Sequence, residues 1–314
     1  MRVLIPYDGS SSSDAVIDDL QRAGLPDRVD ALVLSVADVW MPPTDEEPGA
    51  TLPDDLPVAL KMARAQAAEA VEEARVLSTT AADRVRQLFP AWHIEAESLA
   101  EAPAWAIIKK VEDWRADLVV LGSHGRTALS QFILGTVAQK VLTEVHCSVR
   151  IARPSKAAAD APVRIVLGID GSPGADEALR VVMNREWPDN SEVRVVASAD
   201  ARVSVARAPF VPPTAGWVYE SDETTHSWIH DVVDSAAGDL RRAGLGVSQV
   251  VRDGDPREIL IAEAATWGAD CIFVGASGLT RLGYLVVGSV STAVAARAGC
   301  TVEVVRPAPH TTRV

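Results

Sequence analysis

Short apolar runs alternate with longer amphipathic or Ala-rich stretches along the whole chain. The runs that predict strands are 3–8, 31–38, 93–98, 117–121 and 147–152, then 165–170, 193–200, 246–252, 270–274 and 300–305. The stretches that predict helices are 12–23, 56–88 and 130–145, then 173–184, 222–243 and 283–298, with two more opening at Pro103 and Pro256. We expect the long helix 56–88 to break near residues 78–80. This alternation is typical of an α/β fold in which helices cover both faces of a parallel sheet, with right-handed crossovers.

The second half of the chain repeats the first. Val3–Ser10 and Ile165–Ser172 are both apolar strands that end in Asp-Gly-Ser. The segments Trp114–Asp117 and Trp267–Asp270 are near copies, and each precedes a buried strand. Two domains of five strands and four helices are therefore expected, at 1–153 and 163–307. The Ala-rich segment 154–162 between them is expected to be a short flexible linker.

Composition and charge exclude several classes of protein. The chain of 314 residues carries a net charge of −13, which disfavours nucleic acid and anionic membrane surfaces as partners. No apolar run is long enough to cross a membrane, and the start of the chain has the pattern of a first strand rather than a signal peptide. Three cysteines with no C-x-x-C pair favour a reducing, cytoplasmic environment over a disulfide framework or zinc site.

A glycine motif follows the fourth strand of each half. Gly122 and Gly125 are followed, nine residues later, by Gly135-Thr136, and the same spacing recurs at Gly275, Gly278 and Gly288-Ser289. Glycines at a strand end allow a sharp turn with exposed N–H groups, and a helix start attracts anions. We interpret the motif as a phosphate cradle with a hydroxyl donor from Thr136 or Ser289. The alternative is that the glycines only make tight strand-to-helix turns.

An aspartate ends the first strand of each half. In doubly wound sheets, ligands bind beyond the carboxyl ends of the strands, where the strand order reverses. If the first and fourth strands are neighbours there, Asp8 and Asp170 meet the glycine motifs in one crevice. The alternative role for each aspartate is to cap the following helix, for which residues 11–14 are further candidates in the first half.

These features resemble the universal stress protein family in its tandem form. The resemblance covers nearly the whole chain and rests on the doubled G-x-x-G-x9-G-[S/T] motif, the Asp-Gly-Ser after each first strand, and the order of elements. It implies a Rossmann-like fold similar to that of the adenine nucleotide alpha hydrolases. Members with this motif bind ATP or a related adenine nucleotide. From this we expect a role as a nucleotide-occupancy sensor or regulator in stress response, through an unknown protein partner.

The resemblance further implies which residues contact the nucleotide. Asp8 with Val36, and Asp170 with Ser198, would hold the adenosine. The cradle residues that would hold ribose and phosphates are Gly122, Gly125, Gly135 and Thr136 in the first half and Gly275, Gly278, Gly288 and Ser289 in the second. His124 and Arg126 would face a phosphate in the first half, whereas the second half has Ser277 in place of His124 and Arg281 in a part related to that of Arg126. The first site is therefore expected to be the tighter one.

The last strands of the two halves suggest how the halves pair. In the resembled family such strands pair between subunits, so here they would pair within one chain and form an intramolecular pseudo-dimer, which leaves further homo-oligomers open. Arg150 and Glu303 hold matching positions and would face each other with opposite charges near the pseudo-two-fold axis. A homodimer of either half would instead place like charges together.

Sequence motifs give little support for catalysis. The chain has no G-x-x-x-x-G-K-[ST] loop, no kinase motif set, and no G-x-G-x-x-G after a first strand. A slow ATPase and a nucleotide-independent adaptor stay open as alternatives to the sensor. Mg²⁺ is expected only as a companion of the phosphates, because no carboxylate cluster in the sequence calls for a metal.

Overall fold

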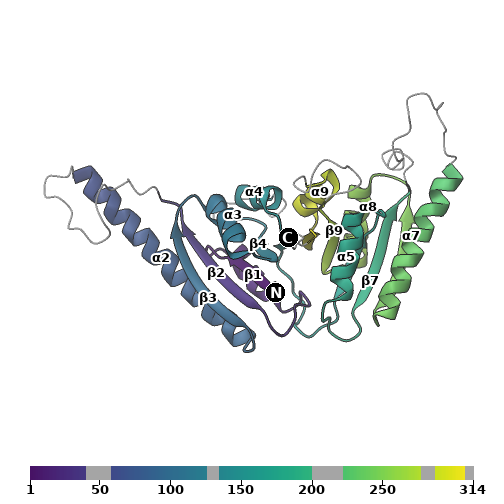
Figure 1. Ribbon diagram of the computed structural model, residues 1–314, viewed down its shortest axis with the longest axis horizontal. Helices are drawn as coiled ribbons and strands as arrows, with labels where there is room; N and C mark the ends of the chain where they lie inside the picture. The colour runs from purple at the N-terminus through teal and green to yellow at the C-terminus, as the bar shows by residue number, and fades with distance from the viewer. Residues whose placement is uncertain (40–57, 126–133, 200–221, 277–286, 308–314) are drawn as a thin grey trace, which may run out of the picture.

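The two halves of the chain share one continuous sheet. The computed structural model describes residues 1–39, 58–125, 134–199, 222–276 and 287–307. The strands in this described part are β1 (Arg2–Pro6), β2 (Asp30–Ala37), β3 (His93–Ala100), β4 (Leu118–Gly122), β5 (Ser148–Ala152), β6 (Arg164–Gly168), β7 (Glu192–Ser198), β8 (Gly246–Arg252), β9 (Cys271–Gly275) and β10 (Thr301–Val305). They form one ten-stranded sheet in the order β3-β2-β1-β4-β5-β10-β9-β6-β7-β8 (Figure 1). Strands pair in parallel within each half, and β5 pairs with β10 antiparallel at the junction.

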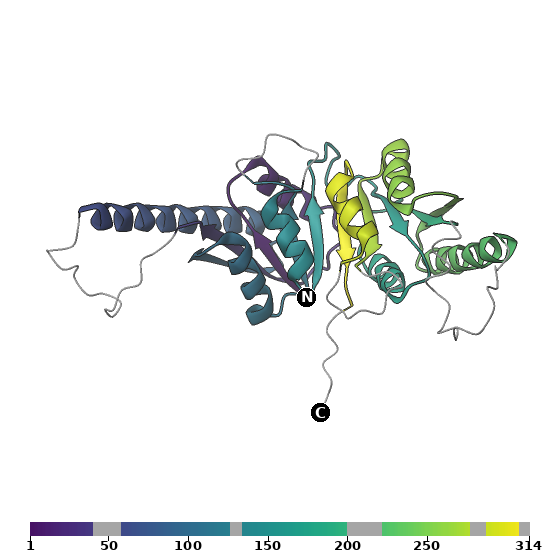
Figure 2. The same cartoon turned by 90° about the horizontal axis from the view of Figure 1, so that it is seen from above.

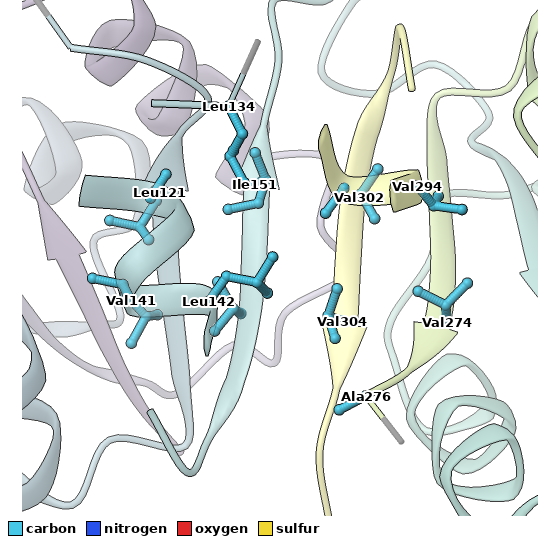
Figure 3. Packing of buried hydrophobic residues seen from close by; sticks show 14 of the residues in the cluster. Leu121, Leu134, Val141, Leu142, Ile151, Val274, Ala276, Val294, Val302 and Val304 are labelled. Atoms are coloured by element: carbon cyan, nitrogen blue, oxygen red, sulfur yellow. The ribbon is translucent and has the colours of Figure 1, made fainter. Parts of the chain in front are cut away.

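Helices cover both faces of this sheet. The described helices are α1 (Ser11–Leu20), α2 (Val58–Leu88), α3 (Pro103–Trp114), α4 (Thr136–Glu144), α5 (Pro173–Met183), α7 (Asp222–Arg242), α8 (Pro256–Trp267) and α9 (Ser289–Arg297). One apolar cluster runs across both halves beneath α3, α4, α8 and α9 (Figure 3). On the other face each half has its own cluster, beneath α1 and α2 or beneath α5 and α7. The shared cluster makes the two halves one packed body on that face.

The observed elements confirm the predicted α/β order and correct two details. Helix α2 continues without a break through residues 78–80, because the hydroxyls of Ser78 and Thr79 donate to the Arg75 carbonyl and stay within the helix. Figure 2 shows α2 extending beyond the sheet it covers. Helices α4 and α9 begin later than predicted, at Thr136 and Ser289, since the glycine before each has an extended backbone.

The antiparallel junction confirms the predicted pairing of Arg150 with Glu303. The two residues are direct partners in the β5–β10 register, and Arg150 Nη1 lies 3.1 Å from Glu303 Oε2. Arg150 Nε also lies 2.6 Å from Asp19 Oδ2, and Arg185 completes the network with a contact to Glu303. Four alternating charges are thus buried between the halves, so the pairing within one chain is electrostatically specified.

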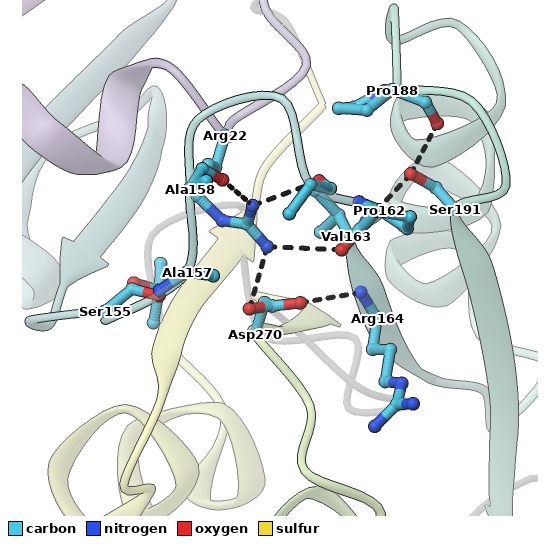
Figure 4. Close-up of polar contacts among 12 residues, drawn as sticks. Arg22, Ser155, Ala157, Ala158, Pro162, Val163, Arg164, Pro188, Ser191 and Asp270 are labelled. Atoms are coloured by element: carbon cyan, nitrogen blue, oxygen red, sulfur yellow. Dashed lines mark hydrogen bonds and ion pairs between the residues drawn. The ribbon is translucent and has the colours of Figure 1, made fainter.

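The linker is held in place, which corrects the expectation of a flexible join. Arg22, just past the end of α1, donates to the carbonyls of Ala158 at 2.5 Å and Ala161 at 3.0 Å (Figure 4). Its other terminal nitrogen lies 2.9 Å from Asp270 of the second half. The Arg22 side chain is 6% exposed. One buried guanidinium therefore joins the first half, the linker and the second half.

No helix in the described part of the chain is long and apolar enough to cross a membrane.

Candidate functional site

The strand order reverses between β1 and β4 in the first half and between β6 and β9 in the second. The chain passes from β1 through β2 to β3 on one side, and β4 pairs with the other side of β1. The strands are parallel, so Asp8 and the glycine motif leave the sheet at the same edge. The second half has the same arrangement around Asp170. The expected crevice therefore exists in the topology of both halves.

Each aspartate is fixed by a short turn and does not cap the helix. Asp8 Oδ1 accepts the Ser10 N–H at 3.0 Å, and Asp170 Oδ1 accepts the Ser172 N–H at 2.9 Å. The N-caps are Ser10 and Ser172 themselves, whose hydroxyls accept the N–H of the third helical residue. The capping role suggested for the aspartates and for residues 11–14 is therefore wrong.

The Asp8 carboxylate lies against the second glycine of the motif. A methyl group placed on Gly125 would lie 3.1 Å from Asp8 Oδ2. The structure thus brings together two residues that are 117 positions apart in the sequence. Any side chain at position 125 would enter the space next to this carboxylate.

The first glycine of each motif serves packing rather than an exposed turn. A Cβ on Gly122 would lie 2.5 Å from the Ser12 hydroxyl and 2.8 Å from the Ser12 carbonyl oxygen. A Cβ on Gly275 would lie 2.4 Å from the Gly174 carbonyl carbon. The ends of β4 and β9 therefore press against the first turns of α1 and α5, which leaves no room for a side chain. This finding supports the structural alternative for these two glycines.

The third glycine of each motif is the N-cap of the next helix. Gly135 donates its N–H to Ser123 O at 2.8 Å, and Gly288 donates its N–H to Ala276 O at 2.6 Å. Neither glycine supplies a side-chain cap, so the first N–H groups of α4 and α9 have no acceptor of that kind. Thr136 and Ser289 are the first helical residues, and both are exposed. The starts of α4 and α9 are thereby tied to the ends of β4 and β9.

A polar pair follows β4 in the first half. The Ser123 hydroxyl lies 2.8 Å from His124 Nδ1, and the His124 N–H donates to Ser12 Oγ at 3.3 Å. Ser123 is buried, whereas His124 is half-buried. Ala276 takes the place of Ser123 in the second half, so this hydroxyl is missing there. Ser12 was considered only as a candidate helix cap, because nothing distinguishes it from its serine neighbours before the fold is known.

Val36 and Ser198 lie at the carboxyl ends of the second strands: Val36 is the second-last residue of β2, and Ser198 is the last residue of β7. The Tyr7 N–H donates to Leu34 O at 2.8 Å. Asp8 and Val36 therefore both lie just beyond the same hydrogen bond between the first and second strands. Both Val36 and Ser198 are half-buried. Val36 packs on the apolar cluster, while the Ser198 hydroxyl donates to Gly254 O at 2.6 Å. The two halves therefore differ in polarity and in loop attachment at this position.

Tyr7 adds a half-buried phenol next to Asp8. Its hydroxyl donates to Asp14 Oδ1 at 2.8 Å, and Arg84 contacts the same carboxylate oxygen at 2.9 Å. Partial burial and the hydrogen bond to Asp14 raise the pKa of Tyr7 to about 12. Tyr7 is therefore a neutral donor that ties the end of β1 to α1.

Two of the sequence-predicted residues, Arg126 and Gly278, lie outside the described residues, as do the Pro-rich segments 40–57 and 200–221. Within the described ranges, no group of three or more His, Cys, Asp or Glu side chains could hold a metal ion.

Comparisons with known proteins give the family. The model described as "Universal stress protein family" matches residues 1–153 and again residues 163–306. The chain belongs to the universal stress protein family. A universal stress protein of Mycobacterium tuberculosis is 27% identical over 312 residues, which cover 97% of this chain and 96% of that protein.

A solved structure of a universal stress protein shares the fold over nearly the whole chain. A universal stress protein from Archaeoglobus fulgidus matches with a TM-score of 0.62 and 20% identity, over 97% of this chain and 98% of that one. An Arabidopsis thaliana family member solved with AMP bound covers 48% of this chain and 97% of its own, at 16% identity and a TM-score of 0.34. The tandem architecture of this universal stress protein thus has a full-length structural counterpart.

Proposed function

We propose that this universal stress protein binds ATP in the crevices of its two halves and acts as a nucleotide-occupancy sensor in stress response. The observation that carries the proposal is the contact between Asp8 and Gly125 in front of the uncapped start of α4. A carboxylate and a row of backbone N–H groups offer acceptors for ribose hydroxyls and donors for phosphates, respectively. These are the two kinds of partner that a nucleotide requires.

Each part of the site has a separate task in this proposal. Asp8 accepts from the ribose, held in position by its bond to the Ser10 N–H. Val36 forms an apolar wall for the adenine at the end of β2. The first N–H groups of α4, with the Thr136 hydroxyl, face the phosphates. Mg²⁺ enters with the phosphates, because the described residues contain no carboxylate cluster to hold it alone.

We further propose that the first site binds more tightly than the second. The first half has Ser123 and His124 beside the cradle, where the second half has Ala276 and Ser277. The second half also engages the Ser198 hydroxyl with Gly254, so this hydroxyl must leave its acceptor before it can donate to an adenine. Both differences favour an unequal pair of sites.

Calorimetric titration with ATP, ADP and cyclic AMP tests the proposal. Gly125→Val places a branched side chain beside the Asp8 carboxylate, and is expected to remove one of two binding events. Gly238→Ala in α7 is the matched control, because a Cβ there meets nothing within 4 Å. Gly278→Val should remove the other event.

The outcomes separate the competing functions. Loss of one event in each cradle variant, with the control unchanged, supports the sensor. Steady ATP turnover above background would favour the slow ATPase. No binding of any of the three nucleotides would show that the glycines are turn residues and that the protein is a nucleotide-independent adaptor.

A further inference from the structure

The linker is held between the two halves by a defined set of contacts. Arg22 donates to the carbonyls of Ala158 and Ala161 and pairs with Asp270, as described above. Asp270 Oδ2 also accepts the backbone N–H of Arg164 at 2.8 Å (Figure 4). The groove thus combines a carboxylate, a cation and donors for peptide carbonyls.

The repeat creates a second groove of the same kind on the other side of the pseudo-two-fold axis. Asp117 matches Asp270, because its Oδ2 accepts the backbone N–H of Arg2 at 2.7 Å. Asn184 matches Arg22, since each lies twelve residues after the N-cap of its helix. The second groove therefore keeps the carboxylate and replaces the long cation with a short amide.

The second groove is open where the first is filled. It forms a cavity of about 360 Å³ whose lining includes Asp117, Asn184, Arg185, Cys147 and Arg306. In the described ranges, Asp117 forms no ion pair and the Asn184 side chain forms no hydrogen bond. A carboxylate and an amide thus remain available to an occupant that brings a cation and peptide carbonyls.

We propose that the C-terminal tail, residues 308–314, occupies the second groove as the linker occupies the first. The tail follows Arg306-Pro307, and the linker follows the equivalent Arg153-Pro154. The two arginines act alike: Arg306 donates to Leu142 O and Cys147 O of the first half, and Arg153 donates to Ala295 O and Cys300 O of the second. Arg306 lines the open cavity, so β10 ends at the edge of this cavity.

The composition of the tail matches the groove. Residues 308–314 correspond in the repeat to residues 155–161 of the linker. Arg313 lies six residues beyond Pro307, a reach of up to about 20 Å for an extended chain. Its guanidinium would form an ion pair with Asp117, as Arg22 does with Asp270. Ala308 and Pro309 are small and apolar, as are the four alanines among residues 157–161 of the linker.

Docking of the tail would bridge the halves a second time. The linker joins α1 to the second half, and the tail would join α5 to the first half. Both sites would then hold small residues next to an aspartate, with the cation supplied by Arg22 in the first and by the tail in the second. This inference does not depend on nucleotide binding, so the two proposals can fail separately.

Disulfide trapping in the full chain tests the docking. Thr312→Cys is combined with Asn184→Cys in the cavity or, as a matched control, with Glu144→Cys on the surface. Glu144 is exposed and lies two residues after Leu142, whose carbonyl Arg306 contacts, so an undocked tail can reach it. The native thiols provide the background, which is measured with Thr312→Cys alone; burial raises their pKa.

The expected result is an intramolecular disulfide that forms several-fold faster with Asn184→Cys than with Glu144→Cys, because docking raises the local concentration. Adding Arg313→Glu should abolish that difference. Equal rates for the two pairs would overturn the proposal, and so would a preference that survives Arg313→Glu. A disulfide that forms only between chains would show instead that the groove receives a second copy of the protein.

Discussion

Arg150 and Glu303 face each other across the only antiparallel junction among the described strands, at the pseudo-two-fold axis of the molecule. Both side chains are almost fully buried, at 1% and 0% exposure. A strict repeat would place identical residues at this point, and the chain instead places opposite charges there. The network alternates in sign from Asp19 through Arg150 and Glu303 to Arg185. The interface is therefore complementary only between unlike halves.

Replacing Arg150 with Met should destabilise the protein by about 3–5 kcal/mol, because Asp19 and Glu303 would remain buried without their cation. The exchange Arg150→Glu with Glu303→Arg should not restore stability. It would place a second carboxylate beside Asp19 and a second guanidinium beside Arg185, so the alternation of charges is lost. Denaturant unfolding of the full chain measures both effects.

A surface ion pair serves as the control for this prediction. Arg84 contacts Asp14 and Asp18 with a side chain that is 40% exposed. Arg84→Met should change the unfolding free energy by no more than about 1 kcal/mol. If the Arg150/Glu303 exchange recovers stability, the charges of Asp19 and Arg185 do not depend on the orientation of the central pair, and the prediction is wrong.

The first glycines of the two motifs should matter for stability rather than for ligand binding. Gly122→Ala and Gly275→Ala would each place a methyl group within about 2.5 Å of the helix backbone or Ser12, and overpacking of this kind costs about 1–3 kcal/mol. Gly238→Ala should be neutral or stabilising, since it lies inside α7 with free space. Thermal unfolding measures the three variants. A Gly122→Ala protein of normal stability that has lost nucleotide binding would contradict the packing role.

The sequence predicted the architecture well because its repeat and its apolar runs are local patterns. Even the junction could be predicted, since Arg150 and Glu303 occupy matching positions in matching strands. The roles of Asp19, Arg22 and Arg185 could not be predicted in this way. Each lies at or just beyond the end of a helix, where polar residues are ordinary, and its partners come from distant parts of the chain.

Only part of the candidate site could be predicted from the sequence. The spacing of the glycines indicates where the chain turns, but not what lies against each turn. Gly122 turned out to face Ser12, while Gly125 faces Asp8, although the motif presents the two glycines alike. A glycine can allow close packing or leave room for a ligand, and only the tertiary contacts show which of the two applies.

The elevated pKa of Tyr7, about 12, predicts a loss of stability in strong base. The folded state favours the neutral phenol, so its contribution is complete below the ordinary tyrosine pKa of about 10 and is lost as the pH rises toward 12. Spectrophotometric titration of the three tyrosines in the chain should show one that ionises late. Tyr7→Phe should remove this late component and, with the hydrogen bond to Asp14, about 1 kcal/mol of stability. An unchanged titration curve per remaining tyrosine would disprove the assignment.

The bonds of Arg22 to the linker predict resistance to proteolysis between the halves. Trypsin can cleave after Lys156, four residues after β5 ends, but the neighbouring carbonyls of Ala158 and Ala161 are held by Arg22. Arg22→Ala should speed this cleavage and cost about 1–3 kcal/mol, because the linker carbonyls and Asp270 lose their hydrogen bonds to a charged, buried guanidinium. Arg28→Ala is the control: it is an exposed arginine between α1 and β2, and its loss should leave cleavage after Lys156 unchanged. Limited proteolysis followed by mass spectrometry gives the rate at this one bond. Rapid cleavage of the unaltered protein at Lys156 would mean that the bonds of Arg22 do not protect the linker.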